Sequence, residues 1–280
     1  MPTPLRIALI AVTFSILVYA LWHGPLGERL PRPGPQLGNV ALVTLDAPAT
    51  ARPARLTETS RADLTNYSTE DAYAPDPTQG TRHRTETGVV WWGGGPEGGA
   101  SRPAILLLHD AGQTGHSMVD MWHEVALAEG LVLVAPDFPD NADTPYIYDP
   151  RAAFEALAHA ATLYPVDMER IAIFGHSRGG QAAQLWVNRL DGPWKAAAAH
   201  AGTLSPSVVQ RVAEGVPIAH FLGSVDRVFP FAPARESAQI LAQAGHPTDL
   251  IRLDGHNHWF YETGEAISAA AWRWMGPHLD

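Results

Sequence analysis

Residues 175–179 read Gly-His-Ser-Arg-Gly, a spacing that can turn a serine into a nucleophile. The apolar run 171–174 before them predicts a strand, and residues 181–190 after them predict a helix. A serine on such a sharp turn exposes its hydroxyl, while a glycine two positions away on each side avoids collisions with neighbouring backbone. We therefore predict Ser177 as a nucleophile and the backbone N–H of Arg178 as one donor to an oxyanion.

A serine hydroxyl also needs a base to take its proton and a carboxylate to orient that base. When the nucleophile lies on this kind of turn, the acid and then the base follow it along the chain. Asp226 comes shortly after the apolar stretch 218–222, which predicts a strand. We predict that Asp226 is the acid.

Two histidines compete for the role of the base. His256 and His258 both follow the predicted strand 249–253. We favour His258 because the aromatic residues 259–261 come directly after it and could fix its ring; His256 is the alternative base. A His-x-His pair can also bind a metal, but no further ligands are evident, so we predict no metal site.

The second oxyanion donor should come from the loop that follows the apolar strand 104–108. Small residues in this loop, 109–115, let backbone N–H groups approach a substrate oxygen, and we predict Ala111 as the donor, with Gly112 as the alternative. The histidine that opens the loop either orders it or is simply buried. Candidate residues of the substrate pocket are His109, Gly112 and His176.

The elements around these residues alternate strands with amphipathic helices, which predicts an α/β fold with a mostly parallel sheet and helices on both faces. Further strands are expected at 88–92, 131–135 and 195–200, and further helices at 118–129, 150–163, 233–244 and 264–275. The stretch between residues 195 and 218 is too short for a large cap domain. Functional groups should lie at the carboxyl ends of the strands.

The composition excludes several classes of function. The net charge is −10, Lys195 is the only lysine and there is no cysteine in the 280 residues. A nucleic-acid surface is not expected without clustered basic residues. Disulfides, a thiol nucleophile and zinc–thiolate sites are excluded.

Three segments divide the chain. Residues 1–23 contain the uncharged run 7–22, which is shorter than the roughly 20 residues of a membrane span and is also typical of a signal-peptide core. We predict export, either as a periplasmic or secreted protein or as one anchored in the membrane by this segment. Residues 24–56 contain six prolines and are predicted to form a tether. Residues 57–280 form the predicted α/β domain.

Four motifs together resemble the dienelactone hydrolase-like branch of the α/β hydrolases, which is itself similar to polyhydroxybutyrate depolymerase-like esterases. They are residues 108–112, 175–179, 223–230 and 258–261, and the resemblance covers about residues 88–280. It implies an α/β-hydrolase fold and carboxylic ester hydrolysis without a cofactor. Asp110 departs from the glycine that relatives usually carry, so the oxyanion loop can differ in detail.

We therefore expect a serine hydrolase that cleaves a small ester or short acyl substrate through an acyl-enzyme. A serine peptidase with the same triad is the nearest alternative. A catalytically silent binding protein on the same fold is an alternative of a different class. The oligomeric state is left open by the sequence.

Overall fold

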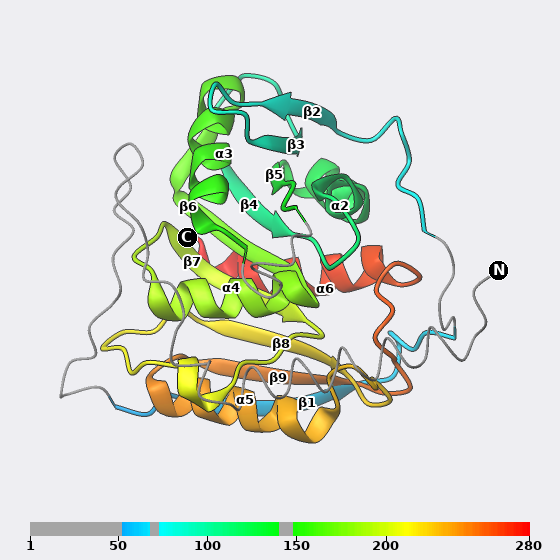
Figure 1. Cartoon of the computed structure of the whole chain (residues 1–280), viewed down its shortest axis with the longest axis vertical. Coiled ribbons are helices and arrows are strands. Elements are labelled where there is room, and N and C mark those ends of the chain that lie inside the picture. The colour runs from blue at the N-terminus through cyan, green and yellow to red at the C-terminus, as the bar shows by residue number, and fades with distance from the viewer. Residues whose placement is uncertain (1–51, 68–72, 140–147) are drawn as a thin grey trace.

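A computed structural model describes residues 52–67, 73–139 and 148–280 (Figure 1). The predicted N-terminal apolar segment and nearly all of the predicted tether lie outside these residues. No helix within the described ranges is long and apolar enough to cross a bilayer.

Strands and helices alternate along most of the described chain. The strands are β1 (Leu56–Arg61), β2 (Thr81–Arg84), β3 (Val90–Gly94), β4 (Arg102–Leu108), β5 (Val132–Pro136), β6 (Val166–His176), β7 (Trp194–His200), β8 (Ile218–Gly223) and β9 (Thr248–Leu253). The α-helices are α2 (Gly115–Glu129), α3 (Pro150–Leu163), α4 (Arg178–Arg189), α5 (Phe231–Ala244) and α6 (Gly264–Met275), with short 3₁₀ helices at Pro206–Val208 and Gly276–His278.

The described strands form one sheet in the order β1-β9-β8-β7-β6-β4-β5-β3-β2. From β1 to β5 in this order all neighbours are parallel, whereas β3 and β2 are antiparallel to theirs. The predicted mostly parallel sheet is confirmed. After β4 the chain continues to β5 on one side, and after β6 it continues to β7 on the other. Loops at the carboxyl ends of β4 and β6 therefore meet at a topological switch point, where ligands commonly bind.

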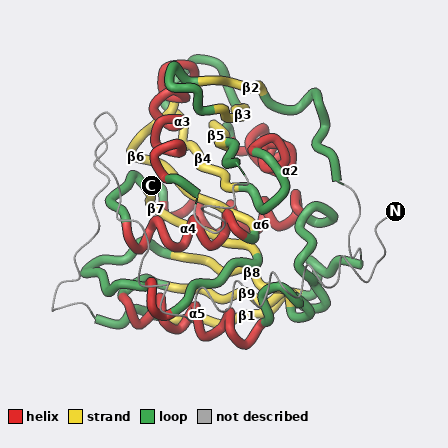
Figure 2. Tube along the Cα trace, viewed as in Figure 1, coloured by secondary structure: helices red, strands yellow, loops and turns green. Residues whose placement is uncertain are grey.

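Helices cover both faces of the sheet, as predicted, with α4 and α6 on opposite faces (Figures 1 and 2). In β4, Leu106 and Leu108 face the core beneath α3 and α4, whereas Ile105 and Leu107 face the core beneath α2 and α6. All four side chains are fully buried. A continuous apolar run is what a strand buried on both faces requires, because each face packs against helices.

Local interactions fix two of the helix ends. The side chain of Asp149 accepts a hydrogen bond from Arg151 N, which caps α3 with Pro150 at its first position. Gly130 ends α2 in the left-handed conformation, with φ of 68°.

Two strands were not predicted. β2 adds an antiparallel edge next to β3, and β1 pairs in parallel with β9 at the opposite edge. β1 begins at Leu56, and Ala54 N already donates to Ala242 O of α5 at 2.7 Å. The last residues of the predicted tether therefore belong to the domain, because they extend the chain towards its edge strand.

Candidate active site

Ser177 lies on a strained turn between β6 and α4, with φ of 52° and ψ of −115°. A side chain at Gly175 would place its Cβ 2.1 Å from Gly179 O, and one at Gly179 would place it 2.0 Å from Leu108 O. Only glycine fits either position. The turn is fixed further by Ser177 N, which donates to His200 O at 2.9 Å. The strand–turn–helix context predicted for this serine is confirmed.

The structure brings Ser177, His258 and Asp226 together in one hydrogen-bonded chain. His258 Nε2 lies 3.0 Å from Ser177 Oγ, and His258 Nδ1 lies 2.9 Å from Asp226 Oδ2. The carboxylate places the imidazole proton on Nδ1, so Nε2 is left to accept the serine proton. The side chain of Asp226 is 0% exposed and that of His258 is 26% exposed, so only the base side of the chain is open to solvent.

The loops that carry the acid and the base are joined by hydrogen bonds. Val225 N donates to His256 O at 3.1 Å, and Gly255 N donates to Ser224 Oγ at 2.8 Å. A Cβ at Gly223 would lie 2.2 Å from His256 O, so the close approach of the two loops depends on this glycine. Since β8 and β9 are adjacent and parallel, their carboxyl ends set the two loops side by side.

His256 is not placed as the base. Its side chain is fully buried, with Nδ1 2.8 Å from Leu64 O and Nε2 2.9 Å from His200 Nε2. Both ring nitrogens are therefore engaged away from Ser177. Burial lowers the pKa of His256. Of the two histidines left open by the sequence, the geometry selects His258.

Three buried imidazoles form a hydrogen-bonded chain beneath the base. The carbonyl of Leu64 can only accept, which assigns a proton to His256 Nδ1 and leaves its Nε2 to accept from His200 Nε2. His200 Nδ1 then accepts from His176 Nδ1 at 3.0 Å. Burial lowers the pKa of His176 and of His200 well below the usual range, so all three rings are neutral at pH 7.

The ring of His258 is flanked by residues other than those expected. Its aromatic neighbours are His176 and Phe229, with centroids 5.2 and 5.6 Å away. Phe260 instead stacks on His176, one layer deeper. The expectation that residues 259–261 fix the ring directly is wrong, because the chain turns after His258 and directs Phe260 into the core.

A short N-terminal segment supports the loop of the base and was missed by the sequence analysis. Asn66 is 4% exposed and its Nδ2 donates to Asn257 Oδ1 and Trp259 O, at 2.9 and 2.6 Å. In return Asn257 N donates to Asn66 Oδ1 at 2.8 Å. No local pattern distinguishes this asparagine from its polar neighbours, because its partners are about 190 positions away.

The predicted oxyanion donors belong to two different elements. Arg178 N is at the first position of α4, and Ala111 follows β4 in an exposed loop. The carbonyl of Asp110 accepts from Tyr148 Oη at 3.1 Å and lies 2.6 Å from His109 Nδ1. Since Phe138 N donates to His109 Nε2, the proton of that ring is on Nδ1 and points at this carbonyl. The Asp110–Ala111 peptide is thereby fixed, with its N–H directed away from these partners.

The predicted pocket residues divide into buried and exposed ones. His109 is 0% exposed and His176 is 1% exposed, and neither side chain lines the described pocket. Each ring is used within the protein instead, His109 to order the oxyanion loop and His176 in the imidazole chain. Gly112 is exposed and lines a pocket beside the loop.

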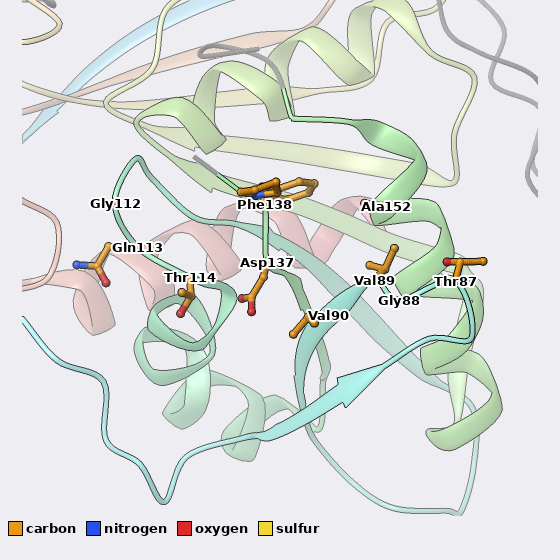
Figure 3. A pocket seen from close by; sticks show the side chains of 11 residues that line it. Thr87, Gly88, Val89, Val90, Gly112, Gln113, Thr114, Asp137, Phe138 and Ala152 are labelled. Atoms are coloured by element: carbon orange, nitrogen blue, oxygen red, sulfur yellow. The ribbon is translucent and has the colours of Figure 1, made fainter. Parts of the chain in front are cut away.

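That pocket has a volume of about 670 Å³ and lies between the oxyanion loop, the start of β3 and the segment after β5 (Figure 3). Phe138 in its wall stacks on Tyr148 at 4.1 Å, and the Arg178 guanidinium lies 5.8 Å from the Tyr148 ring. Side-chain contacts therefore lead from the wall of the pocket to Arg178, while the described lining does not include Ser177, Asp226 or His258. Its lining residues are Thr87, Gly88, Val89, Val90, Gly112, Gln113, Thr114, Asp137, Phe138, Pro139 and Ala152.

Asp137 alone carries a charge among these described lining residues. Its Oδ1 accepts Gly115 N at 2.8 Å, which satisfies a free N–H at the start of α2. Burial raises the pKa of the Asp137 carboxyl above its ordinary value. The described wall therefore offers no positive charge to a substrate anion.

The family model of the dienelactone hydrolase family matches residues 144–274, which include the turn of Ser177 and the loops of Asp226 and His258. The matched part of the chain is similar to the dienelactone hydrolases, and the chain has the α/β-hydrolase fold. The predicted resemblance is confirmed, and the hydrolase is a serine hydrolase. No curated protein sequence matches the chain.

Solved structures share the fold of the hydrolase at low sequence identity. Esterase 2 of Thermogutta terrifontis, phosphonylated by cyclosarin, aligns with a TM-score of 0.58 and 18% identity over 73% of this chain and 97% of that one. An S-formylglutathione hydrolase from Agrobacterium tumefaciens aligns with a TM-score of 0.56 and 18% identity, over 71% of this chain and 94% of that one. A puromycin-hydrolyzing peptidase of Mycobacterium tuberculosis aligns with a TM-score of 0.57 and 17% identity, over 74% of this chain and 42% of that one. At these identities the likeness establishes the α/β-hydrolase fold.

Proposed function

We propose that the protein hydrolyses carboxylic esters through an acyl-enzyme on Ser177. The observation that carries this proposal is the continuous hydrogen-bonded chain from Asp226 Oδ2 through both nitrogens of His258 to Ser177 Oγ. Its distances of 2.9 and 3.0 Å lie within the range that proton transfer between a serine and a base requires.

In this mechanism Ser177 Oγ attacks the ester carbonyl while His258 Nε2 takes its proton. Negative charge then develops on the carbonyl oxygen, which the N–H groups of Arg178 and Ala111 stabilise. Such a donor contributes about 3 kcal/mol to the transition state. His258 gives the proton to the leaving alkoxide, and the alcohol departs. Water, activated by the same imidazole, then attacks the carbonyl carbon of the acyl-enzyme. The tetrahedral intermediate that forms breaks its bond to Ser177 Oγ, which frees the acid and restores the serine.

The pocket beside the oxyanion loop is taken as the substrate pocket, and its lining suggests the substrate class. Neutral and apolar groups form most of its wall, and the single carboxylate of Asp137 disfavours an acid group on the substrate. We infer a small uncharged ester. A peptidase is the second candidate, because the same three side chains can cleave amides and one structural neighbour is named as a peptidase.

The experiment combines a covalent probe with turnover. Wild-type protein should react with a fluorophosphonate and cleave a short-chain nitrophenyl ester, and Ser177→Ala should do neither. Equal rates for the two proteins would refute the proposal, and failure of the wild type to label would favour a silent binding protein. A parallel panel of aminoacyl amides separates the alternatives, since preferential amide cleavage would identify a peptidase.

We also propose that residues 7–22 direct export of the protein, since this uncharged run precedes the proline-rich tether. Full-length protein produced in a bacterial host should leave the cytoplasm, whereas a variant without residues 2–23 should stay there. Fractionation with an activity assay on each fraction measures this. Equal distribution of both proteins would contradict the proposal.

A further inference from the structure

One side-chain hydrogen bond joins the oxyanion loop to the loop of the base. Tyr261 Oη donates to Asp110 Oδ1 at 2.5 Å. Asp110 is the residue before Ala111, and Tyr261 lies three positions after His258. The two loops approach Ser177 from different strands, β4 and β9, so this bond spans the site.

The side chain of Tyr261 is packed against two further residues beside this bond. Its ring stacks on Tyr73 with centroids 4.1 Å apart and an angle of 9° between the planes. Ser117 Oγ lies 3.1 Å from the hydroxyl and itself donates to Thr114 O at 2.8 Å. Tyr261 is 7% exposed, so the bond to Asp110 is largely protected from water.

Electrostatics determine that Tyr261 is the donor and Asp110 the acceptor in this hydrogen bond. Burial, together with the carboxylate of Asp110, raises the pKa of Tyr261 well above its ordinary value, so the phenol stays protonated and donates. On its other side the carboxylate has His176 Nε2 at 4.0 Å. By the proton assignment above, His176 Nε2 carries no proton, so its contact with Asp110 is not an ion pair. Tyr261 is therefore the stronger partner of the Asp110 carboxylate.

The main chain of Asp110 is restrained as well. Its carbonyl is fixed by His109 and Tyr148, and its side chain by Tyr261. The peptide that carries Ala111 N–H is thus held at two points, one of which belongs to the loop of the base. A glycine at position 110 would retain only the first.

We propose that Asp110 and Tyr261 are a pair of positioning residues that fix the oxyanion loop relative to His258. This inference rests on the proposed ester hydrolysis at Ser177. The pair touches no reacting atom. Its effect is on the placement of Ala111 N–H, a group that contributes only when charge develops on the substrate oxygen.

The test uses Tyr261→Phe and Asp110→Ala, with Asp110→Asn as the conservative variant. The first two should lower kcat for a nitrophenyl ester by about tenfold or more while KM changes little, because misplacement of a donor weakens only the transition state. Asp110→Asn should recover most of kcat, since its amide oxygen still accepts from Tyr261. The double variant should be no slower than the slower single variant, because both remove the same bond.

Tyr73, whose ring stacks on Tyr261, provides a matched control. Tyr73 Oη donates to Asp120, on α2, so Tyr73→Phe removes another tyrosine–carboxylate bond while it keeps the aromatic ring that stacks on Tyr261. This variant should lower Tm and keep kcat, with active sites counted by a stoichiometric organophosphonate. If Tyr261→Phe and Asp110→Ala lower only Tm, or if Asp110→Asn is as slow as Asp110→Ala, the positioning role is wrong. Failure of the proposed function itself would show separately, as full turnover by Ser177→Ala.

Discussion

Asp226 divides its two carboxylate oxygens between the backbone and His258. Oδ1 accepts Val228 N and Phe229 N at 2.7 and 2.9 Å, while Oδ2 faces His258 Nδ1 at 2.9 Å. The backbone of its own loop therefore fixes the Asp226 carboxylate independently of His258. A rigid acid determines which nitrogen of His258 carries the proton, and this arrangement makes a specific prediction.

Asp226→Asn should remove nearly all turnover without unfolding the protein. The asparagine oxygen can still accept the two backbone N–H groups, which turns its NH₂ towards His258 Nδ1. That nitrogen must then accept, so the proton moves to Nε2, which no longer takes the proton of Ser177. We expect kcat to fall by about 10⁴-fold, as for the equivalent change in other triads. Ester turnover and a thermal melt measure both effects, with the exposed Asp191→Asn as control; turnover within tenfold of the wild type would contradict the tautomer argument.

His258→Ala and His256→Ala should separate catalysis from stability. His258 is partly exposed, so its loss should leave Tm nearly unchanged and lower kcat by at least about 10³-fold. Loss of His256 leaves Leu64 O and His200 without their partner and should lower the free energy of unfolding by about 1–3 kcal/mol. Urea unfolding and turnover at low temperature distinguish the two. An inactive but fully stable His256→Ala protein would reverse the assignment of the base.

Gly179→Ala should prevent the turn of the nucleophile from forming. The added Cβ would lie 2.0 Å from Leu108 O, and neither the strand nor the helix can move without disrupting the sheet. We expect a loss of more than about 3 kcal/mol of stability together with all activity. Gly94→Ala is the matched control, because its Cβ meets only side-chain atoms at 3.7 Å. Similar melting curves for the two variants would contradict this account.

Acid should destabilise the protein through its buried histidines. Burial lowers the pKa of His220 to about 3, so the unfolded chain binds a proton near pH 6.5 while the folded protein does not. Stability from this group is therefore complete above about pH 6.5 and is lost at about 1.4 kcal/mol per pH unit as the pH falls towards the folded value. His220→Leu should flatten the dependence of the unfolding free energy on pH.

The control for that experiment is Leu241→Ala, which removes a fully buried side chain without a titratable group. It should lower the stability equally at pH 7 and pH 5, whereas the difference between wild type and His220→Leu should change over this interval. Parallel curves for all three proteins would show that His220 takes no part in the acid response.

Much of the architecture follows from local sequence. The apolar run of β4, the cap of α3 at Asp149 and the glycines around Ser177 act on their immediate neighbours, so their effects can be predicted from spacing alone. The order of nucleophile, acid and base along the chain also placed Asp226 correctly, because parallel strands bring their carboxyl ends to the same edge. The meeting of these side chains is confirmed, and their catalytic roles stay predictions for mutation to test.

Tertiary structure decided what the spacing left open. His256 and His258 have equivalent positions in the sequence, and only the carbonyl of Leu64 and the ring of His200 turn the first of them into the core. The support of Asn66 for the base loop and the bond between Tyr261 and Asp110 likewise join residues more than 140 positions apart. A chain encodes local conformation through neighbouring residues, whereas the direction of a loop side chain depends on whichever distant groups satisfy its hydrogen bonds once the sheet has formed.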